Sequence, residues 1–533
     1  MNYSVFKILL VLTVSLSFTN CAKRGTPTGG AKDSIAPILV SANPNNKSIY
    51  FKSKKIKIYF DEYIKLKNVS KQLVVSPPQK KDPIITPLGS ASKSITIEIS
   101  DTLDLNTTYS FNFGKSIVDN NEENELGNFK YVFSTGSFID SLELSGEVTN
   151  PRVKKTEKNF DVMLYEYNKS YTDSIIFKEK PRYISNTLDS TLFELTNLRA
   201  GKYLLIALKD ANGNKIYNPE IDKIGFVKDT IIIPTDKKYN FTIFKEIPKL
   251  KVIKPKEVTK GHLVFGYLGD AKNLNIELLT ATPEGFKSEI NFEKDKDTIN
   301  YWHTAIEIDS LNFRVSKGEY SEEFTLKTRS SKMDSLIVKK STSGILHLID
   351  TFSISTNIPI STFDKSLIKI TDQDSITIDF EPILSKSKTK LYLNFDKKNN
   401  SKYLFKLLPK TITTVFGVSN DSLSFQLTTK LPEDYGILNF ELSSEKKSSF
   451  IVELLDKKEV VVRTKKIENP QTISFILLPP DTYSIRVIVD ENKNGIWDTG
   501  NFLKKQQPEV VKYFDKEIKI RANWDQNETF ILK

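Results

Sequence analysis

Residues 106–113 read NTTYSFNF, so aromatic residues at positions 109, 111 and 113 alternate with small polar ones. This period of two, after turn-forming residues, is typical of a β-strand with one buried face. Similar alternating runs occur at 56–60, 94–99 and 129–133, and residues common in turns separate them. Several such strands in close succession predict an antiparallel β-sandwich. No stretch shows the pattern of a helix longer than two or three turns.

The same stretch occurs a second time, at residues 400–407, which read NSKYLFKL. The register is kept to the strand ends, because equal numbers of positions separate Tyr109 from Tyr403 and Thr135 from Thr429. Two in-register matches of this length indicate a duplicated domain.

A second repeat joins FELTNLRAGKY, residues 193–203, to ISFILLPPDTY, residues 473–483. It continues into two loops rich in aspartate and asparagine, DANGN at 210–214 and DENKN at 490–494. The chain therefore contains two pairs of related units, and the strand-rich segment 248–338 belongs to neither pair.

The N-terminus has the layout of a secretory leader, with Lys7, an apolar stretch at 8–16 and small or polar residues up to Cys21. The apolar stretch is too short for a stable membrane span. Cys21 is the only cysteine of the 533 residues, so no intramolecular disulfide can form. The alternative is an ordinary secreted protein in which the cysteine stands at the cut site by chance.

Both repeats resemble known families. The first resembles the bacterial Ig-like domain of S-layer and other envelope proteins, through Ala36-Pro37, Asn43-Pro44, IYFDE at 58–62, NTTY at 106–109 and VFSTG at 132–136. The second resembles the transthyretin-like or carboxypeptidase-regulatory sandwich, through the L-x-x-G-x-Y run from Leu198 to Tyr203. The leader with Cys21 resembles a bacterial lipoprotein leader, in which the thiol carries palmitate-type lipid and becomes the new N-terminus. Together these features resemble outer-membrane lipoproteins of Bacteroidota.

The resemblances imply an all-β fold of tandem Ig-like and transthyretin-like β-sandwiches on an N-terminal lipid tether. The expected parts are a signal peptide at 1–20, a lipidated tether at 21–32, an Ig-like domain at 33–138, a transthyretin-like sandwich at 139–247, an unassigned β domain at 248–338, a second Ig-like domain at 339–432 and a second transthyretin-like sandwich at 433–533.

The charge of the chain argues against nucleic acid as a partner. The net charge is +11, but lysines spread over many turns rather than forming one basic stripe. Lysines placed in this way are typical of solvated loops and protected strand edges.

No catalytic constellation is visible, so we expect a protein that is not an enzyme and has no catalytic residues. The three histidines, His262, His303 and His347, are far apart and have no metal-ligand spacing. No Gly-x-Ser-x-Gly elbow occurs, and the lipid would use up the one thiol. A pair of carboxylates that meets only in space stays open as an alternative.

The loop DENKNGIWD, residues 490–498, has the start of an oxygen-ligand Ca²⁺ loop, with glycine at its sixth position. Its candidate metal ligands are Asp490, Asn492, Asn494 and Asp498. The bidentate glutamate expected at position twelve is replaced by Asn501, and the earlier copy has Lys215 at position six. The alternative, which we prefer, is an Asx-rich turn that needs no cofactor.

The resemblance implies a non-enzymatic scaffold or adaptor at the outer membrane. It would be anchored by the lipid on Cys21 and would bind an integral outer-membrane partner, such as the machinery that assembles or exports outer-membrane proteins. Ala22 gives no inner-membrane retention signal. We expect the cell surface, with the periplasmic face as the alternative. The competing function is that of a surface lipoprotein that binds glycans.

Overall fold

The computed structural model describes residues 32–293, 296–304, 309–445 and 448–532. Strands dominate this part of the chain, and its one α-helix is the short α2 (Val69–Gln72). The predicted all-β class is therefore confirmed. The chain forms two compact units, one that ends at Ser141 and one that begins at Leu142. No helix among the described residues is both long and apolar enough to cross a membrane.

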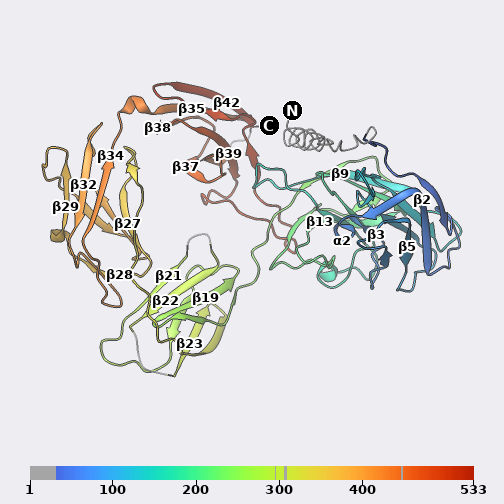
Figure 1. Cartoon of the computed structure of the whole chain (residues 1–533), viewed down its shortest axis with the longest axis horizontal. Helices are drawn as coiled ribbons and strands as arrows, with labels where there is room; N and C mark the ends of the chain where they lie inside the picture. Colours follow the sequence, from blue (N-terminus) through green and yellow to red (C-terminus); the bar gives the residue numbers. More distant parts are fainter. Residues whose placement is uncertain (1–31, 294–295, 305–308, 446–447, 533) are drawn as a thin grey trace, which may run out of the picture. The chain divides into compact units, whose positions relative to one another are not determined.

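The first unit is a sandwich of two sheets (Figure 1, blue to cyan). One sheet has the order β1-β2-β5-β4 with β7 also paired to β2, and the other has the order β3-β6-β8. The strands are β1 (Leu39–Asn43), β2 (Lys55–Leu66), β3 (Val74–Ser76), β4 (Ile84–Thr86), β5 (Ser92–Glu98), β6 (Thr108–Asn112), β7 (Ile117–Asp119) and β8 (Lys130–Ser134). The alternating aromatic residues of β6 and β8 fill the core between the sheets.

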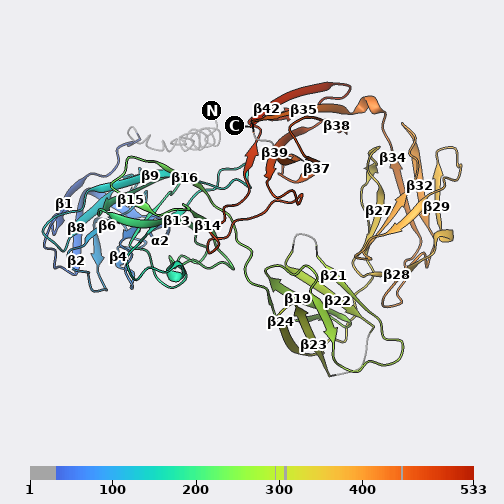
Figure 2. The same cartoon turned by 180° about the vertical axis from the view of Figure 1, so that it is seen from behind.

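The second unit begins with a sandwich whose sheets have the orders β11-β10-β13-β14, with β15 also paired to β13, and β12-β9-β16. Strand β16 runs parallel to β9 (Figure 2). The elements are β9 (Leu142–Thr149), β10 (Asp161–Glu166), the 3₁₀ turn η1 (Asp173–Phe177), β11 (Tyr183–Asn186), β12 (Leu192–Leu198), β13 (Gly201–Lys209), β14 (Lys223–Phe226), β15 (Ile231–Ile233) and β16 (Tyr239–Thr242).

The next sandwich has the sheet orders β17-β19-β22-β21, with β18 also paired to β19, and β20-β23-β24. Its strands are β17 (Lys251–Val252), β18 (Lys256–Thr259), β19 (His262–Leu268), β20 (Asn275–Leu278), β21 (Ser288–Phe292), β22 (Thr298–His303), β23 (Ser310–Lys317) and β24 (Tyr320–Lys327). A separate cluster of buried side chains, from Val252 to Leu326, forms its core.

A further sandwich has the sheet orders β25-β27-β31-β30 and β26-β34-β32-β29, with the pair β28-β33 beside them. Its elements are β25 (Val338–Lys340), β26 (Gly344–Ile345), β27 (Phe352–Thr356), β28 (Ile360–Phe363), η2 (Lys365–Leu367), β29 (Ile368–Asp372), β30 (Glu381–Leu384), β31 (Lys390–Asn394), β32 (Lys402–Leu407), β33 (Ile412–Thr414) and β34 (Leu423–Thr428).

The last sandwich follows the short turn η3 (Pro432–Asp434) and has the sheet orders β38-β35-β42 and β37-β36-β39-β40, with β41 also paired to β39. Strand β42 runs parallel to β35, as β16 does to β9. The strands are β35 (Gly436–Ser444), β36 (Ser449–Leu455), β37 (Val461–Ile467), β38 (Thr472–Leu478), β39 (Thr482–Asp490), β40 (Val511–Tyr513), β41 (Ile518–Lys519) and β42 (Asp525–Leu532).

Corresponding tyrosines of the two copies of each repeat make the same hydrogen bond. The Tyr109 hydroxyl accepts a hydrogen bond from the Asp104 N–H at 2.9 Å, and the Tyr403 hydroxyl accepts one from the Lys398 N–H at 2.7 Å. In the other repeat, the Tyr203 hydroxyl donates to the Arg199 carbonyl at 3.1 Å, and the Tyr483 hydroxyl donates to the Pro479 carbonyl at 2.9 Å. Each tyrosine therefore fixes the turn before its own strand.

Candidate functional site

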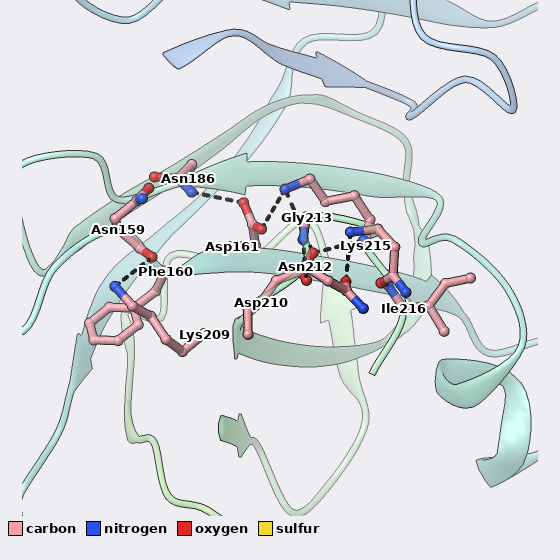
Figure 3. Close-up of polar contacts among 12 residues, drawn as sticks. Asn159, Phe160, Asp161, Asn186, Lys209, Asp210, Asn212, Gly213, Lys215 and Ile216 are labelled. Carbon is pink, nitrogen blue, oxygen red and sulfur yellow. Dashed lines mark hydrogen bonds and ion pairs between the residues drawn. The ribbon is translucent and has the colours of Figure 1, made fainter. Parts of the chain in front are cut away.

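The Asp210 loop, residues 210–216, follows β13 and is closed by its own backbone (Figure 3). The Asp210 carboxylate accepts hydrogen bonds from the N–H groups of Gly213 and Lys215, both at 2.8 Å. The Asn212 side-chain oxygen accepts one from the Asn214 N–H at 3.1 Å. Gly213 has a φ of +74°, which glycine adopts without strain. These contacts are those of an Asx-rich turn.

The ammonium group of Lys215 lies beside this loop, close to two carboxylates. Its ammonium nitrogen lies 2.7 Å from Asp161 Oδ2 and 3.8 Å from Asp210 Oδ2. Figure 3 shows the lysine side chain reaching back over the strand toward Asp161. The other oxygen of Asp161 accepts a hydrogen bond from the Asn186 amide at 2.8 Å. The ammonium thus provides the positive charge that two buried carboxylates need.

The Asp490 loop, residues 490–498, repeats the Asx-rich turn after β39, with Gly495 at the position that corresponds to Lys215. Its aspartate accepts hydrogen bonds from the N–H groups of Asn494 at 3.1 Å and Gly495 at 2.9 Å. The side-chain oxygen of Asn494 accepts one from the Ile496 N–H at 2.8 Å, and the Asn492 oxygen accepts one from the Asn494 N–H at 3.0 Å. Three of the four predicted ligands, Asp490, Asn492 and Asn494, therefore accept backbone hydrogen bonds, as the residues of an Asx-rich turn do.

Two other carboxylates complete the Asp490 loop: Asp498, at its end, and Glu509, which the sequence motif does not include. Asp498 accepts hydrogen bonds from the side-chain amides of Asn492 and Asn494. Glu509 accepts from the N–H groups of Glu491 and Asp498, both at 3.0 Å. Burial, with the charges of Asp498 and Asp490, raises the pKa of Glu509. Among the described residues, no group of three or more histidine, cysteine or acidic side chains is arranged to hold a metal ion.

Asp490→Ala should lower the melting temperature equally in excess Ca²⁺ and in excess chelator. The change removes an acceptor of two backbone hydrogen bonds at a buried position, which costs about 1–3 kcal/mol. Differential scanning fluorimetry measures both conditions. Asp210→Ala is the matched control, because Asp210 also accepts two backbone hydrogen bonds within its own loop, in the copy that has Lys215. A loss of stability for Asp490→Ala that appears only when Ca²⁺ is present would contradict the turn.

The three histidines serve packing rather than a shared site. His262 stacks on Trp302 with ring centroids 3.6 Å apart. His303 packs against Phe286, and burial lowers its pKa. His347 lies 3.2 Å from the Tyr435 hydroxyl, and burial lowers its pKa as well. Each of them has an aromatic neighbour of its own.

The long loop between β39 and β40, residues 491–510, packs on the first copy of its own repeat. Phe502 is fully buried there, and its ring meets Phe226 at 90° with centroids 5.3 Å apart. The Phe502 N–H donates to the Glu246 carboxylate. Gln507 donates to the Phe226 carbonyl at 2.9 Å, and Thr499 donates to a second backbone carbonyl at 2.7 Å. This docked loop joins two sandwiches that are far apart in the sequence.

A second contact between the same sandwiches centres on Arg152. Its guanidinium lies over the Trp497 ring at 4.7 Å, and burial lowers its pKa. Its carbonyl accepts hydrogen bonds from Arg486 and from the Tyr513 hydroxyl, both at 3.1 Å. Burial disfavours the charge on Arg486, but the hydrogen bond with Tyr513 and the charge of Glu453 outweigh it and raise the pKa.

No sequence pattern marks the residues of this joint. Phe502, Glu246, Gln507 and Arg152 follow no motif, and their partners are hundreds of positions away. The one available signal was the length of the loop between the Asp490 turn and the next strand. Cys21, the predicted lipidation site, lies outside the described residues.

The first domain matches a known family. Residues 33–135 match the model of the bacterial Ig-like domain, well under half of the chain. No curated protein matches the chain. The protein is therefore an all-β multidomain protein that contains a bacterial Ig-like domain.

Several solved structures are similar at low identity. Domains 1–6 of the surface layer protein SbsC are 11% identical, with 91% of this chain and 67% of that chain covered and a TM-score of 0.16. The major pilin subunit BcpA of Bacillus cereus is 11% identical, with coverage of 73% and 99% and a TM-score of 0.14. The BSP domain of a biofilm associated protein is 10% identical, with coverage of 88% and 97% and a TM-score of 0.16. Scores this low carry no argument about function.

Proposed function

We propose that the protein is a non-enzymatic scaffold, anchored to the outer membrane by lipid on Cys21. Its β-sandwiches would present a binding surface to an integral outer-membrane partner, in the class of machinery that assembles or exports outer-membrane proteins. The leader and its cysteine, followed by a bacterial Ig-like domain at 33–135, support the anchor. The cell surface is our preferred location.

The joint between the two copies of the second repeat is the observation that carries this proposal. The 491–510 loop buries Phe502 against Phe226 and satisfies Glu246 and Gln507 across the same contact. A chain that fixes two sandwiches against each other keeps their outer surfaces at a constant spacing, as an adaptor requires. The matching hydrogen bonds of Tyr203 and Tyr483 support the assignment of both copies to one domain type, for which we propose the transthyretin-like class.

Fractionation and co-purification of the wild type and Cys21→Ser test this function together. The wild type should sediment with outer membranes, because a lipid chain adds about 0.8 kcal/mol of membrane affinity per buried CH₂ group. In mild detergent it should retain an integral outer-membrane protein that mass spectrometry identifies. Cys21→Ser should be soluble or keep its leader, and Ser15→Ala, within the leader, is the control that should behave as the wild type.

Identical fractionation of the wild type and Cys21→Ser would contradict the anchor. A wild type that reaches the membrane but retains no membrane protein would contradict the adaptor. The competing glycan-binding function is favoured by the polar pocket that Tyr167, Tyr171 and Asp173 line.

A further inference from the structure

A polar pocket of about 460 Å³ lies beside the joint, between the end of β10, the η1 turn and the turn from β14 to β15. Its size falls within the range of small-ligand sites, roughly 300–1,000 Å³. Tyr167, Tyr171 and Asp173 line one part, and Lys228 and Thr230 line another. The docked 491–510 loop adds Lys505, so residues from both copies of the repeat form the pocket.

Two tyrosines give the pocket an aromatic surface. The rings of Tyr167 and Tyr171 lie with centroids 4.5 Å apart and an interplanar angle of 38°. Tyr167 is 43% exposed, although the Lys202 ammonium lies 4.6 Å from its ring centre. A tyrosine combines an apolar ring face with a polar hydroxyl at its end, which suits a ligand with both kinds of surface.

Hydrogen-bonding groups stand next to these rings in fixed positions. Asp173 Oδ1 accepts from the Tyr171 hydroxyl and from the Lys505 ammonium, both at 2.7 Å. Burial and the contact with Asp173 raise the pKa of Tyr171, so its hydroxyl keeps its proton. Burial opposes the charge on Asp173, but the hydrogen bonds from Lys505 and Tyr171 outweigh it and lower its pKa. The carboxylate therefore stays an acceptor for further donors.

Charges of both signs line the pocket, which favours a neutral ligand. Lys228 and Lys505 oppose Asp173 and Asp229 within the lining, and Lys202 adds an ammonium beside the Tyr167 ring. An anionic or a cationic ligand would meet a like charge on one wall, whereas a neutral ligand with many hydroxyl groups would meet donors and acceptors.

We propose that this pocket binds a neutral oligosaccharide. One sugar ring would lie on the Tyr167–Tyr171 pair, with its hydroxyl groups hydrogen-bonded to Asp173 and Thr230. The site is complete only while the 491–510 loop is docked, because Lys505 belongs to that loop. The proposal does not depend on the outer-membrane scaffold, because the pocket is formed by folded side chains and does not require the lipid anchor or a membrane partner.

Isothermal titration calorimetry on the full mature chain tests the pocket, with maltohexaose, cellohexaose, laminarihexaose and mannohexaose as neutral probes and polygalacturonate as a charged one. At least one neutral probe should bind at millimolar concentration. Tyr167→Ala and Tyr171→Ala should each weaken that binding by roughly two- to twelvefold, which corresponds to the loss of an aromatic contact of about 0.5–1.5 kcal/mol. Lys505→Ala should weaken it as well, because it removes the ammonium that holds the Asp173 carboxylate in place.

Tyr63→Ala is the matched control, because Tyr63 is 56% exposed and has the Lys93 ammonium 5.5 Å from its ring centre. It should leave the binding unchanged. Three results would overturn the proposal: no neutral probe binds at millimolar concentration, binding survives all three pocket changes, or polygalacturonate binds more tightly than every neutral probe.

Discussion

Phe133→Ala should lower the stability of the first unit by about 3–5 kcal/mol, the usual range for a large aromatic residue in a core. Phe133 is fully buried at the centre of a cluster of rings. Its ring centroid lies 3.8 Å from that of Phe51, 5.4 Å from that of Tyr109 and 6.1 Å from that of Phe111. The truncation removes these contacts and leaves a cavity that rigid sheets on both sides cannot close.

Hydrogen exchange measured by mass spectrometry on the full chain checks this result. Peptides from β6 and β8 should lose protection in Phe133→Ala, while peptides from β36 and β39 keep theirs. Phe138→Ala is the matched control, because Phe138 is 61% exposed and the chemical change is the same. Equal loss of protection in the two variants would show that the ring cluster does not hold the sandwich together.

Arg486→Met should destabilise the last sandwich by about 3–5 kcal/mol, because it leaves the carboxylate of Glu453 largely buried without a partner. The Nε and Nη2 atoms of Arg486 both lie 2.6 Å from Glu453 Oε2. Arg486 is 6% exposed, so water cannot replace the lost donor fully. The same change removes the hydrogen bond to the Arg152 carbonyl and so weakens the joint.

Urea unfolding of three variants separates these effects. The double variant Arg486→Met with Glu453→Gln should recover part of the loss, since no charge is then left buried. Arg463→Met should cost less than about 1 kcal/mol, because Arg463 and its partner Asp350 are both partly exposed and 3.6 Å apart. A double variant less stable than the single one would show that the pair itself, rather than the unpaired charge, governs stability.

The Asp210 and Asp490 loops contain the same sequence motif, and the motif determines only part of their contacts. Spacing alone gives Asp490, Asn492, Asn494 and Asp498 the start of a Ca²⁺ loop. Which donors reach a carboxylate depends on how the chain curls, and here the N–H groups of Asn494 and Gly495 point at Asp490. The ion pair of Lys215 could not be predicted from the motif either, because its partner Asp161 lies on a neighbouring strand.

The sequence by itself determined the strands, the β-sandwich class and the two repeats. Side chains alternate along a strand with a period of two, so the burial of Tyr109, Phe111 and Phe113 is a local property that the order of residues already contains. The tertiary structure alone decided the joint and the pocket beside it. Phe502 meets Phe226, and Lys505 meets Asp173, across hundreds of positions, where no periodicity acts and only the packing of folded surfaces selects the partners.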